Sequence, residues 1–186
     1  MNVGYYALKV RASVMQKREH MELAYEENPD ASLFWCFIDL VNSSNFRIIQ
    51  GPRDGYVRGE TFFAIIRAVI TPCLEIHLIK EIGDSVLLSS RDLRPLLEAM
   101  LLMDHSVSQL AAEAGTEIFP FAIRAGIGYG PAKRLIRNYE DFIGTPIDQL
   151  SRIMAVRKDS TNLLVHNAAY QSHEAIFDEY KTFLEV

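Results

Sequence analysis

Two carboxylates stand where metal chemistry could take place. Asp39 lies near the end of an apolar run at residues 33–41, and Asp84 follows Gly83 between two shorter apolar runs. Carboxylate oxygens are the ligands that hard divalent cations prefer. Taken singly, each also has a plain structural explanation, Asp39 as a strand end and Asp84 as a turn residue. The pair becomes informative only if the fold brings both side chains together.

A second pair of charged residues, Asp148 and Arg152, lies four residues apart in a segment expected to be helical. A guanidinium can bind phosphate oxygens in a fixed, bidentate geometry. The same spacing also lets the two side chains form an ion pair along one helix face. Both interpretations remain open from the residues alone.

The elements that must position the first pair follow from the hydrophobic pattern. The near-continuous apolar run at 33–41 predicts a strand buried on both faces. Runs at 76–81 and 85–90, separated by Gly83 and Asp84, predict a hairpin. Adjacent strands would then bring Asp39 and Asp84 to one edge of a sheet.

The remaining pattern predicts helices and strands in alternation. Helices are expected at 60–74, 93–114 (ending at Gly115), 145–158 and 168–180, strands at 118–129, 131–138 and 162–166, and a loop at 51–55. This order predicts an α+β fold with a ferredoxin-like split βαβ core, in which helices cover one face of a mainly antiparallel sheet. Residues 1–30 form a separate N-terminal segment with a candidate helix at 11–27, and 31–186 form a single domain.

Composition excludes several classes of protein. The 186 residues are 49% hydrophobic, and 19 basic against 24 acidic residues give a net charge of −5. An acidic chain is a poor candidate for coating nucleic acid or docking on an anionic membrane. Cys36 and Cys73 cannot make a disulfide scaffold, and no apolar stretch is long enough to span a bilayer. We therefore expect a cytoplasmic protein with neither a nucleic-acid nor a membrane partner.

Common catalytic signatures are absent. The sequence contains no Walker-type phosphate loop, no HExxH zinc motif and no GxSxG nucleophile elbow. Gly126, Gly128 and Gly130 form GxGxG before Pro131, which does not fit a dinucleotide-binding turn. We interpret these glycines as part of a tight strand exit.

Four segments together carry a family resemblance. In chain order they are FIDLVNSSNF at 37–46, LIKEIGDSVLL at 78–88, FAIRAGIGYG at 121–130 and DFIGTPIDQLSRI at 141–153. Their order and content resemble the catalytic domain of the class III nucleotidyl cyclases, over roughly residues 33–170. The resemblance implies conversion of a nucleoside triphosphate to a 3′,5′-cyclic nucleotide and pyrophosphate.

The resemblance also implies roles for individual residues. Asp39 and Asp84, with the backbone carbonyl of Leu40, would bind two divalent cations, Mn²⁺ or Mg²⁺. Arg152 matches the arginine that stabilises charge on the α-phosphate. Asp148 stands where the family usually has an asparagine that orients the ribose. A carboxylate only accepts hydrogen bonds, whereas an amide also donates them, so this ribose contact is in question.

Two further positions would bind the base. Lys80 and Asp141 match the lysine and aspartate of adenylate cyclases rather than the pair typical of guanylate cyclases. A lysine donor beside an aspartate acceptor complements adenine, but it also complements cytosine or uracil. Hydrogen bonding alone therefore leaves the base open.

Other positions depart from the family pattern. Asn42, Ser43 and Ser44 replace the usual Gly-Phe-Thr, and the C-terminal triphosphate-binding lysine has no clear match. Lys133, Arg134 and Lys181 are candidate substitutes for that lysine. A compact, divergent cyclase of this kind has a general likeness to the stand-alone bacterial pyrimidine cyclases of the Pycsar anti-phage system.

We therefore expect a cyclase that makes cyclic UMP or cyclic CMP. The alternatives are an adenylate cyclase and a catalytically silent nucleotide-binding or regulatory module. A ferredoxin-like RNA-binding module is disfavoured by the acidic charge. The family's site lies between two subunits, so a homodimer is implied in which the Asp39 and Asp84 pair comes from one subunit. Lys80, Asp141, Asp148 and Arg152 would come from the other subunit.

Overall fold

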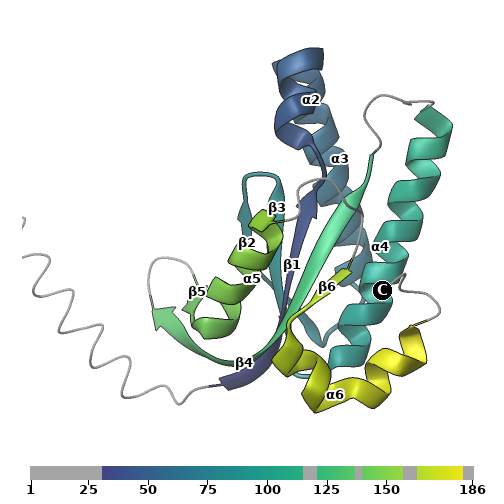
Figure 1. Ribbon diagram of the computed structural model, residues 1–186. Coiled ribbons are helices and arrows are strands. Elements are labelled where there is room, and N and C mark those ends of the chain that lie inside the picture. Colours follow the sequence, from purple (N-terminus) through teal and green to yellow (C-terminus); the bar gives the residue numbers. More distant parts are fainter. Residues whose placement is uncertain (1–30, 115–120, 137–139, 157–162, 182–186) are drawn as a thin grey trace, which may run out of the picture.

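The computed structural model describes residues 31–114, 121–136, 140–156 and 163–181. Within these residues, helices pack on both faces of a six-stranded sheet (Figure 1). The elements are β1 (Ala31–Leu40), α2 (Ser43–Gln50), α3 (Pro52–Ile70), β2 (Ile76–Ile82), β3 (Ser85–Ser90), α4 (Leu93–Ala114), β4 (Ile123–Ile136), β5 (Glu140–Ile143), α5 (Thr145–Val156), β6 (Leu163–Val165) and α6 (Asn167–Tyr180). The predicted helix at 11–27 and the helix stop at Gly115 lie outside the described residues. None of the described helices is long and apolar enough to cross a bilayer.

The sheet has the predicted split βαβ core. Its strand order is β2-β3-β1-β4-β5, and β1 is antiparallel to both β3 and β4. Only the short strand β6 pairs in parallel, with β4, among the described strands. The other strand pairs are antiparallel, so the sheet is mainly antiparallel. The α+β, ferredoxin-like prediction is confirmed, and the predicted β2–β3 hairpin forms around Gly83 and Asp84.

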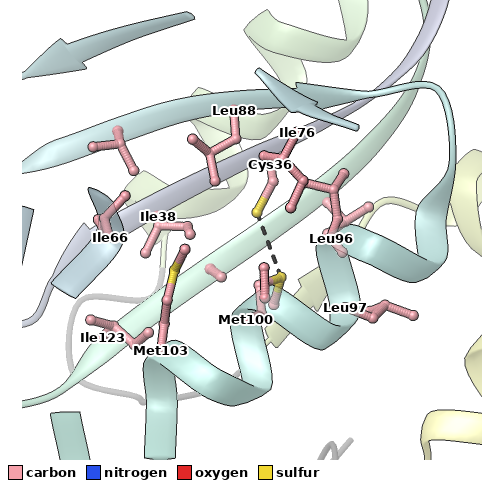
Figure 2. Close-up of a cluster of buried hydrophobic side chains, with 14 of the residues drawn as sticks. Cys36, Ile38, Ile66, Ile76, Leu88, Leu96, Leu97, Met100, Met103 and Ile123 are labelled. Carbon is pink, nitrogen blue, oxygen red and sulfur yellow. Dashed lines mark hydrogen bonds between the residues drawn. The ribbon is translucent and has the colours of Figure 1, made fainter. Parts of the chain in front are cut away.

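The larger core lies on the face of the sheet covered by α3, α4 and α6. Side chains alternate along a strand, and Cys36 and Ile38 of β1 point into this core. Figure 2 shows them facing Leu96, Met100 and Met103 of α4. The Cys36 thiol lies 3.5 Å from the Met100 sulfur and is fully buried. This close apolar contact sets α4 against β1.

The opposite face of β1 carries a second, smaller core. Trp35 is fully buried there, packs on Phe142 of β5 at 5.1 Å between ring centroids, and donates from Nε1 to the Gly130 carbonyl. Ile147 and Leu150 place α5 over this cluster. The expectation of helices on one face is therefore wrong for α5. A strand that is apolar on both faces needs cover on both, and α5 provides it.

Two glycines of β4 allow α5 to pack closely. A Cβ on Gly126 or Gly128 would come within 3.2 Å of the Leu150 side chain. The prediction of two separate strands at 118–129 and 131–138 is wrong, because β4 runs without a break through Pro131 and pairs with β5. The glycines serve helix packing rather than a strand exit.

The region after β1 is more helical than predicted. Residues 43–50 form α2, and the expected loop at 51–55 shrinks to Gly51, whose φ of 96° ends α2. Pro52 then starts α3, since proline fits the first turn of a helix. The predicted helix at 60–74 is the second half of α3, which ends at Ile70.

Candidate functional site

The end of β1 and the β2–β3 turn bring the two predicted carboxylates together. Asp39 lies opposite Ser85 in the β1–β3 register, one residue after Asp84. The Leu40 amide donates to the Asp84 carbonyl at 3.1 Å, which joins the strand end to the turn. Burial raises the pKa of Asp84, and the nearby Asp39 charge raises it further. The juxtaposition expected from the strand order is thus observed.

Asp39 is buried and forms an ion pair with an arginine side chain. Only 9% of the residue is exposed. Arg124, its register partner on β4, donates to Oδ2 from Nε at 2.7 Å and also from Nη2. Ser85 donates from Oγ to Oδ1 at 2.6 Å. Both carboxylate oxygens are therefore held by donors, as a buried charge requires.

Asp84 is half-buried, with a different set of neighbours. Ser43, the first residue of α2, donates from Oγ to Asp84 Oδ2. The positive charges of Arg47, on the same helix, and of Arg124 lower the Asp84 pKa and so offset part of this rise. Asn42 precedes Ser43 in a left-handed conformation with φ 57°, and this turn starts α2 beside the carboxylate.

A buried arginine holds the connection between β1 and α2. Arg58 of α3 is 7% exposed and donates from Nη2 to the Val41 carbonyl at 3.0 Å. Its guanidinium lies 4.4 Å from the Phe46 ring centroid and 5.5 Å from that of Phe121, within cation–π range. These contacts fix the backbone that leads from Asp39 to α2.

Sequence reasoning assigned no role to Arg124 or Arg58, although each had a signal. Arg124 is a lone charge inside the apolar run 121–129. Arg58 lies four residues before Phe62 on a helix face whose other buried members are Ile66 and Ile70. A charge at a position where the pattern requires burial indicates a specific partner.

The carboxylate pair fits a hard divalent cation. Asp39 and Asp84 repel one another, and a cation between them relieves that repulsion. Among the described residues, no group of three or more histidine, cysteine or acidic side chains is placed so that it could hold a metal ion. A cation here would complete its shell with backbone oxygen, water or substrate phosphates, as Mg²⁺ commonly does.

The two base-binding candidates lie on elements that touch. Lys80 is half-buried on β2, and its register partner Leu87 belongs to the core under α5. Asp141 lies on β5, and its side chain is outside the described residues. Although β2 and β5 are at opposite ends of the strand order, β5 contacts β2 (Figure 1). The fold therefore brings the two strands that carry these candidates into contact.

The other two candidates, Asp148 and Arg152, form no bond with the carboxylates within the described residues. Asp148 and Arg152 are both exposed on α5. In the described part of the chain, they form no ion pair with each other and make no hydrogen bond to Asp39 or Asp84. Of the candidate substitute cations, Lys181 lies at the end of α6, 3.8 Å from Asp178.

Comparison with known proteins identifies the fold. No family model matches the chain, and no curated protein matches it. Among solved structures, a bacterial light-regulated adenylyl cyclase superposes with a TM-score of 0.67 at 15% identity, covering 79% of this chain and 81% of that one. The adenylyl cyclase CyaB from P. aeruginosa gives 0.64 at 13% identity, with 80% and 83% covered. The catalytic core of a rhodopsin-guanylyl cyclase with converted specificity, in complex with ATPalphaS, gives 0.64 at 17% identity, with 76% and 80% covered. The chain has the fold of adenylyl and guanylyl cyclase catalytic domains.

Proposed function

We propose that this protein is a nucleotidyl cyclase that converts a nucleoside triphosphate to a 3′,5′-cyclic nucleotide and pyrophosphate. The observation that carries the proposal is the adjacent pair Asp39 and Asp84, at the end of β1 and in the β2–β3 turn of a cyclase fold. Two divalent cations held there, with the Leu40 carbonyl as a further ligand, would activate the ribose 3′-oxygen and neutralise the leaving group. Mn²⁺ and Mg²⁺ are the candidates.

The remaining residues bind and orient the substrate in this proposal. The Arg152 guanidinium stabilises the charge that develops on the α-phosphate. Asp148 accepts a hydrogen bond from a ribose hydroxyl, and Lys80 and Asp141 donate to and accept from the base edge. All four act by holding the triphosphate in the geometry for attack, which supplies much of the rate in such a displacement.

A homodimer with two shared sites is part of the proposal, and the exposure of Asp148 and Arg152 supports it. Asp148 and Arg152 are exposed on α5 and have no bond to the carboxylate pair of their own chain. A two-fold axis would let α5 of one subunit face Asp39 and Asp84 of the other. Mixing Asp39→Ala and Arg152→Ala chains should restore activity, because each mixed dimer retains one intact site. Inactive mixtures that still dimerise would contradict the shared site.

For the base, we propose a pyrimidine, with UTP or CTP as substrate and a role in anti-phage signalling. The general likeness to stand-alone pyrimidine cyclases supports this choice, and Lys80 with Asp141 complements uracil or cytosine. Adenine is the second candidate, since the same pair complements it and the similar rhodopsin-guanylyl cyclase core with converted specificity is a complex with ATPalphaS. A silent nucleotide-binding module is the third candidate, favoured by the Asp148 departure.

Product analysis by mass spectrometry tests these proposals. Purified protein is incubated with Mn²⁺ or Mg²⁺ and each of ATP, GTP, CTP and UTP in turn. Asp39→Ala is the inactive control, and Asp104→Asn, a change at an exposed carboxylate of α4, is the matched active control. Cyclic UMP or cyclic CMP supports the pyrimidine proposal, and cyclic AMP refutes it while supporting a cyclase. Triphosphate binding without any cyclic product indicates the silent module.

A further inference from the structure

Each carboxylate of the pair accepts a hydrogen bond from its own serine. Ser85 donates to Asp39 Oδ1 at 2.6 Å, and Ser43 donates to Asp84 Oδ2. Neither bond belongs to regular secondary structure. The Ser43 hydroxyl opens α2 yet reaches a turn 41 residues further along the chain, rather than capping its own helix.

The backbone conformation on either side of Asn42 directs the Ser43 hydroxyl toward Asp84. Asn42 adopts φ 57° and ψ 23°, a conformation that most residues avoid. On the other side of Asn42, the Val41 carbonyl is held by buried Arg58. The start of α2 is therefore fixed relative to β1, and the Leu40 amide ties β1 to the Asp84 turn.

Ser85 is placed as firmly as Ser43. It is 7% exposed and lies directly across from Asp39 in the β1–β3 register. A hydroxyl buried at this position must find an acceptor, and the Asp39 carboxylate supplies it. The two serines thus reach the pair from different elements, α2 and β3.

We propose that Ser43 and Ser85 are positioning residues that orient the two carboxylates for divalent cations. A carboxylate has about four lone-pair sites. At Asp84 the hydroxyl donor fixes the rotation and leaves the other oxygen for a cation, whereas at Asp39 a cation must compete with Arg124 for Oδ2. The inference rests on the proposed function and concerns the metal site itself. The resemblance places phenylalanine where Ser43 stands, so this tether is a feature of the present chain rather than of the family pattern.

The expected effect follows from metal sites in general. Removing an outer-shell hydrogen-bond partner of a ligand commonly weakens metal binding by about 10–100-fold. The loss of Mn²⁺ affinity in Ser43→Ala should lie in that range, since Asp84 then loses its hydroxyl donor. Ser85→Ala should show a smaller loss, because Arg124 still holds the other oxygen of Asp39.

The test is Mn²⁺ affinity of the full-length chain without nucleotide, measured by electron paramagnetic resonance of free Mn²⁺. The variants are Ser43→Ala, Ser85→Ala and Ser43→Thr, which keeps the hydroxyl. Ser106→Ala is the matched control, because Ser106 is a partly buried serine of α4 whose hydroxyl donates to the Leu102 carbonyl. Asp39→Asn defines binding outside the site. Metal-free thermal melting of each variant separates loss of orientation from loss of folding.

The expected result is weaker Mn²⁺ binding for both alanine variants, near-normal binding for Ser43→Thr, and no change for Ser106→Ala. Wild-type affinity in a folded Ser43→Ala chain would overturn the inference and leave the cyclase proposal standing. A wild-type chain with no more Mn²⁺ binding than Asp39→Asn would overturn the metal site itself. Cyclic-product assays are scored separately, so failure of the chemistry is not confused with failure of the tether.

Discussion

Replacing Arg124 by glutamine should destabilise the metal-free protein and strengthen its binding of Mn²⁺. The Arg124 and Asp39 side chains are 14% and 13% exposed, so their ion pair is largely shielded from water. Removing one member of a buried pair costs about 3–5 kcal/mol because the other charge is left uncompensated. For a chain of this length, about 3 kcal/mol corresponds to a fall in melting temperature of roughly 6–12 °C.

The gain in Mn²⁺ affinity has the same origin. In the wild type, a cation must compete with the Arg124 guanidinium for Asp39. In Arg124→Gln that competition is gone, so the variant should bind Mn²⁺ more tightly. Cation at about 100 times its dissociation constant stabilises the fold by about 2.7 kcal/mol, so saturating Mn²⁺ should restore most of the lost melting temperature.

The assay is thermal melting with and without Mn²⁺, together with a direct Mn²⁺ titration. Arg67→Gln is the matched control, because Arg67 and Glu81 form an ion pair of 2.6 Å with exposures of 52% and 36%. Such an exposed pair contributes about 0–1 kcal/mol, so this variant should melt near the wild type. Equal melting temperatures and equal Mn²⁺ affinities for Arg124→Gln and wild type would refute the reasoning.

Three further predictions concern packing, burial and charge. Gly126→Val should lower the free energy of unfolding by about 1–3 kcal/mol in denaturant melts, because its Cβ would meet the Met154 sulfur at 3.2 Å. Wild-type stability of this variant would show that α5 can shift. Cys36 should resist a disulfide-exchange reagent at pH 8 while the partly exposed Cys73 reacts, because burial raises the pKa of Cys36 to about 12. Rapid reaction of both thiols in each chain would contradict the burial of Cys36. Asp84→Asn should raise the metal-free melting temperature at pH 7, since a folded-state pKa above the unfolded value makes the ionised Asp84 unfavourable to folding. That advantage should fade as the pH falls and Asp84 is protonated in both states, and a constant difference across pH would contradict it.

The parts of the fold that could be predicted are those with a local pattern. The apolar run at 33–41 and the turn at Gly83 and Asp84 set β1 and the β2–β3 hairpin, and these placed Asp39 next to Asp84. Hydrophobic period and turn residues act over a few positions, so one sequence suffices to find them. The split βαβ order then followed from connection rules.

What could not be predicted depends on contacts between distant segments. Whether α5 covers the second face depends on how Gly126 and Gly128 admit Leu150, which only the packed structure shows. The Arg124 pair with Asp39 spans 85 residues, and no local pattern connects them. No helix was predicted at α2, because this segment is short and a short helix depends on tertiary contacts such as that of Arg58 with the Phe46 ring.

The contrast between the two carboxylates leads to a last prediction about cooperativity. Asp84 accepts a hydrogen bond from Ser43 and forms no ion pair within the part of the chain that the structure describes, whereas Asp39 is ion-paired with Arg124. When a divalent cation takes Asp39, the displaced guanidinium stays within reach of the site, where it can bind the polyphosphate that the cation also attracts. Cation and triphosphate should therefore favour each other's binding, and each must raise the other's affinity by the same factor.

Arg124→Gln should reduce this coupling even though it strengthens binding of Mn²⁺ alone. Mn²⁺ titrations with and without a non-cyclisable triphosphate analogue measure the coupling factor in each protein. The expected changes have opposite signs, with Mn²⁺ affinity rising and the coupling factor falling, and this combination identifies the mechanism. A variant that merely distorts the site would lose both Mn²⁺ affinity and coupling, whereas release of a competing guanidinium predicts a gain in the first and a loss in the second. If coupling in Arg124→Gln equals that of the wild type, the guanidinium does not pass from carboxylate to phosphate, and its role ends with neutralising Asp39.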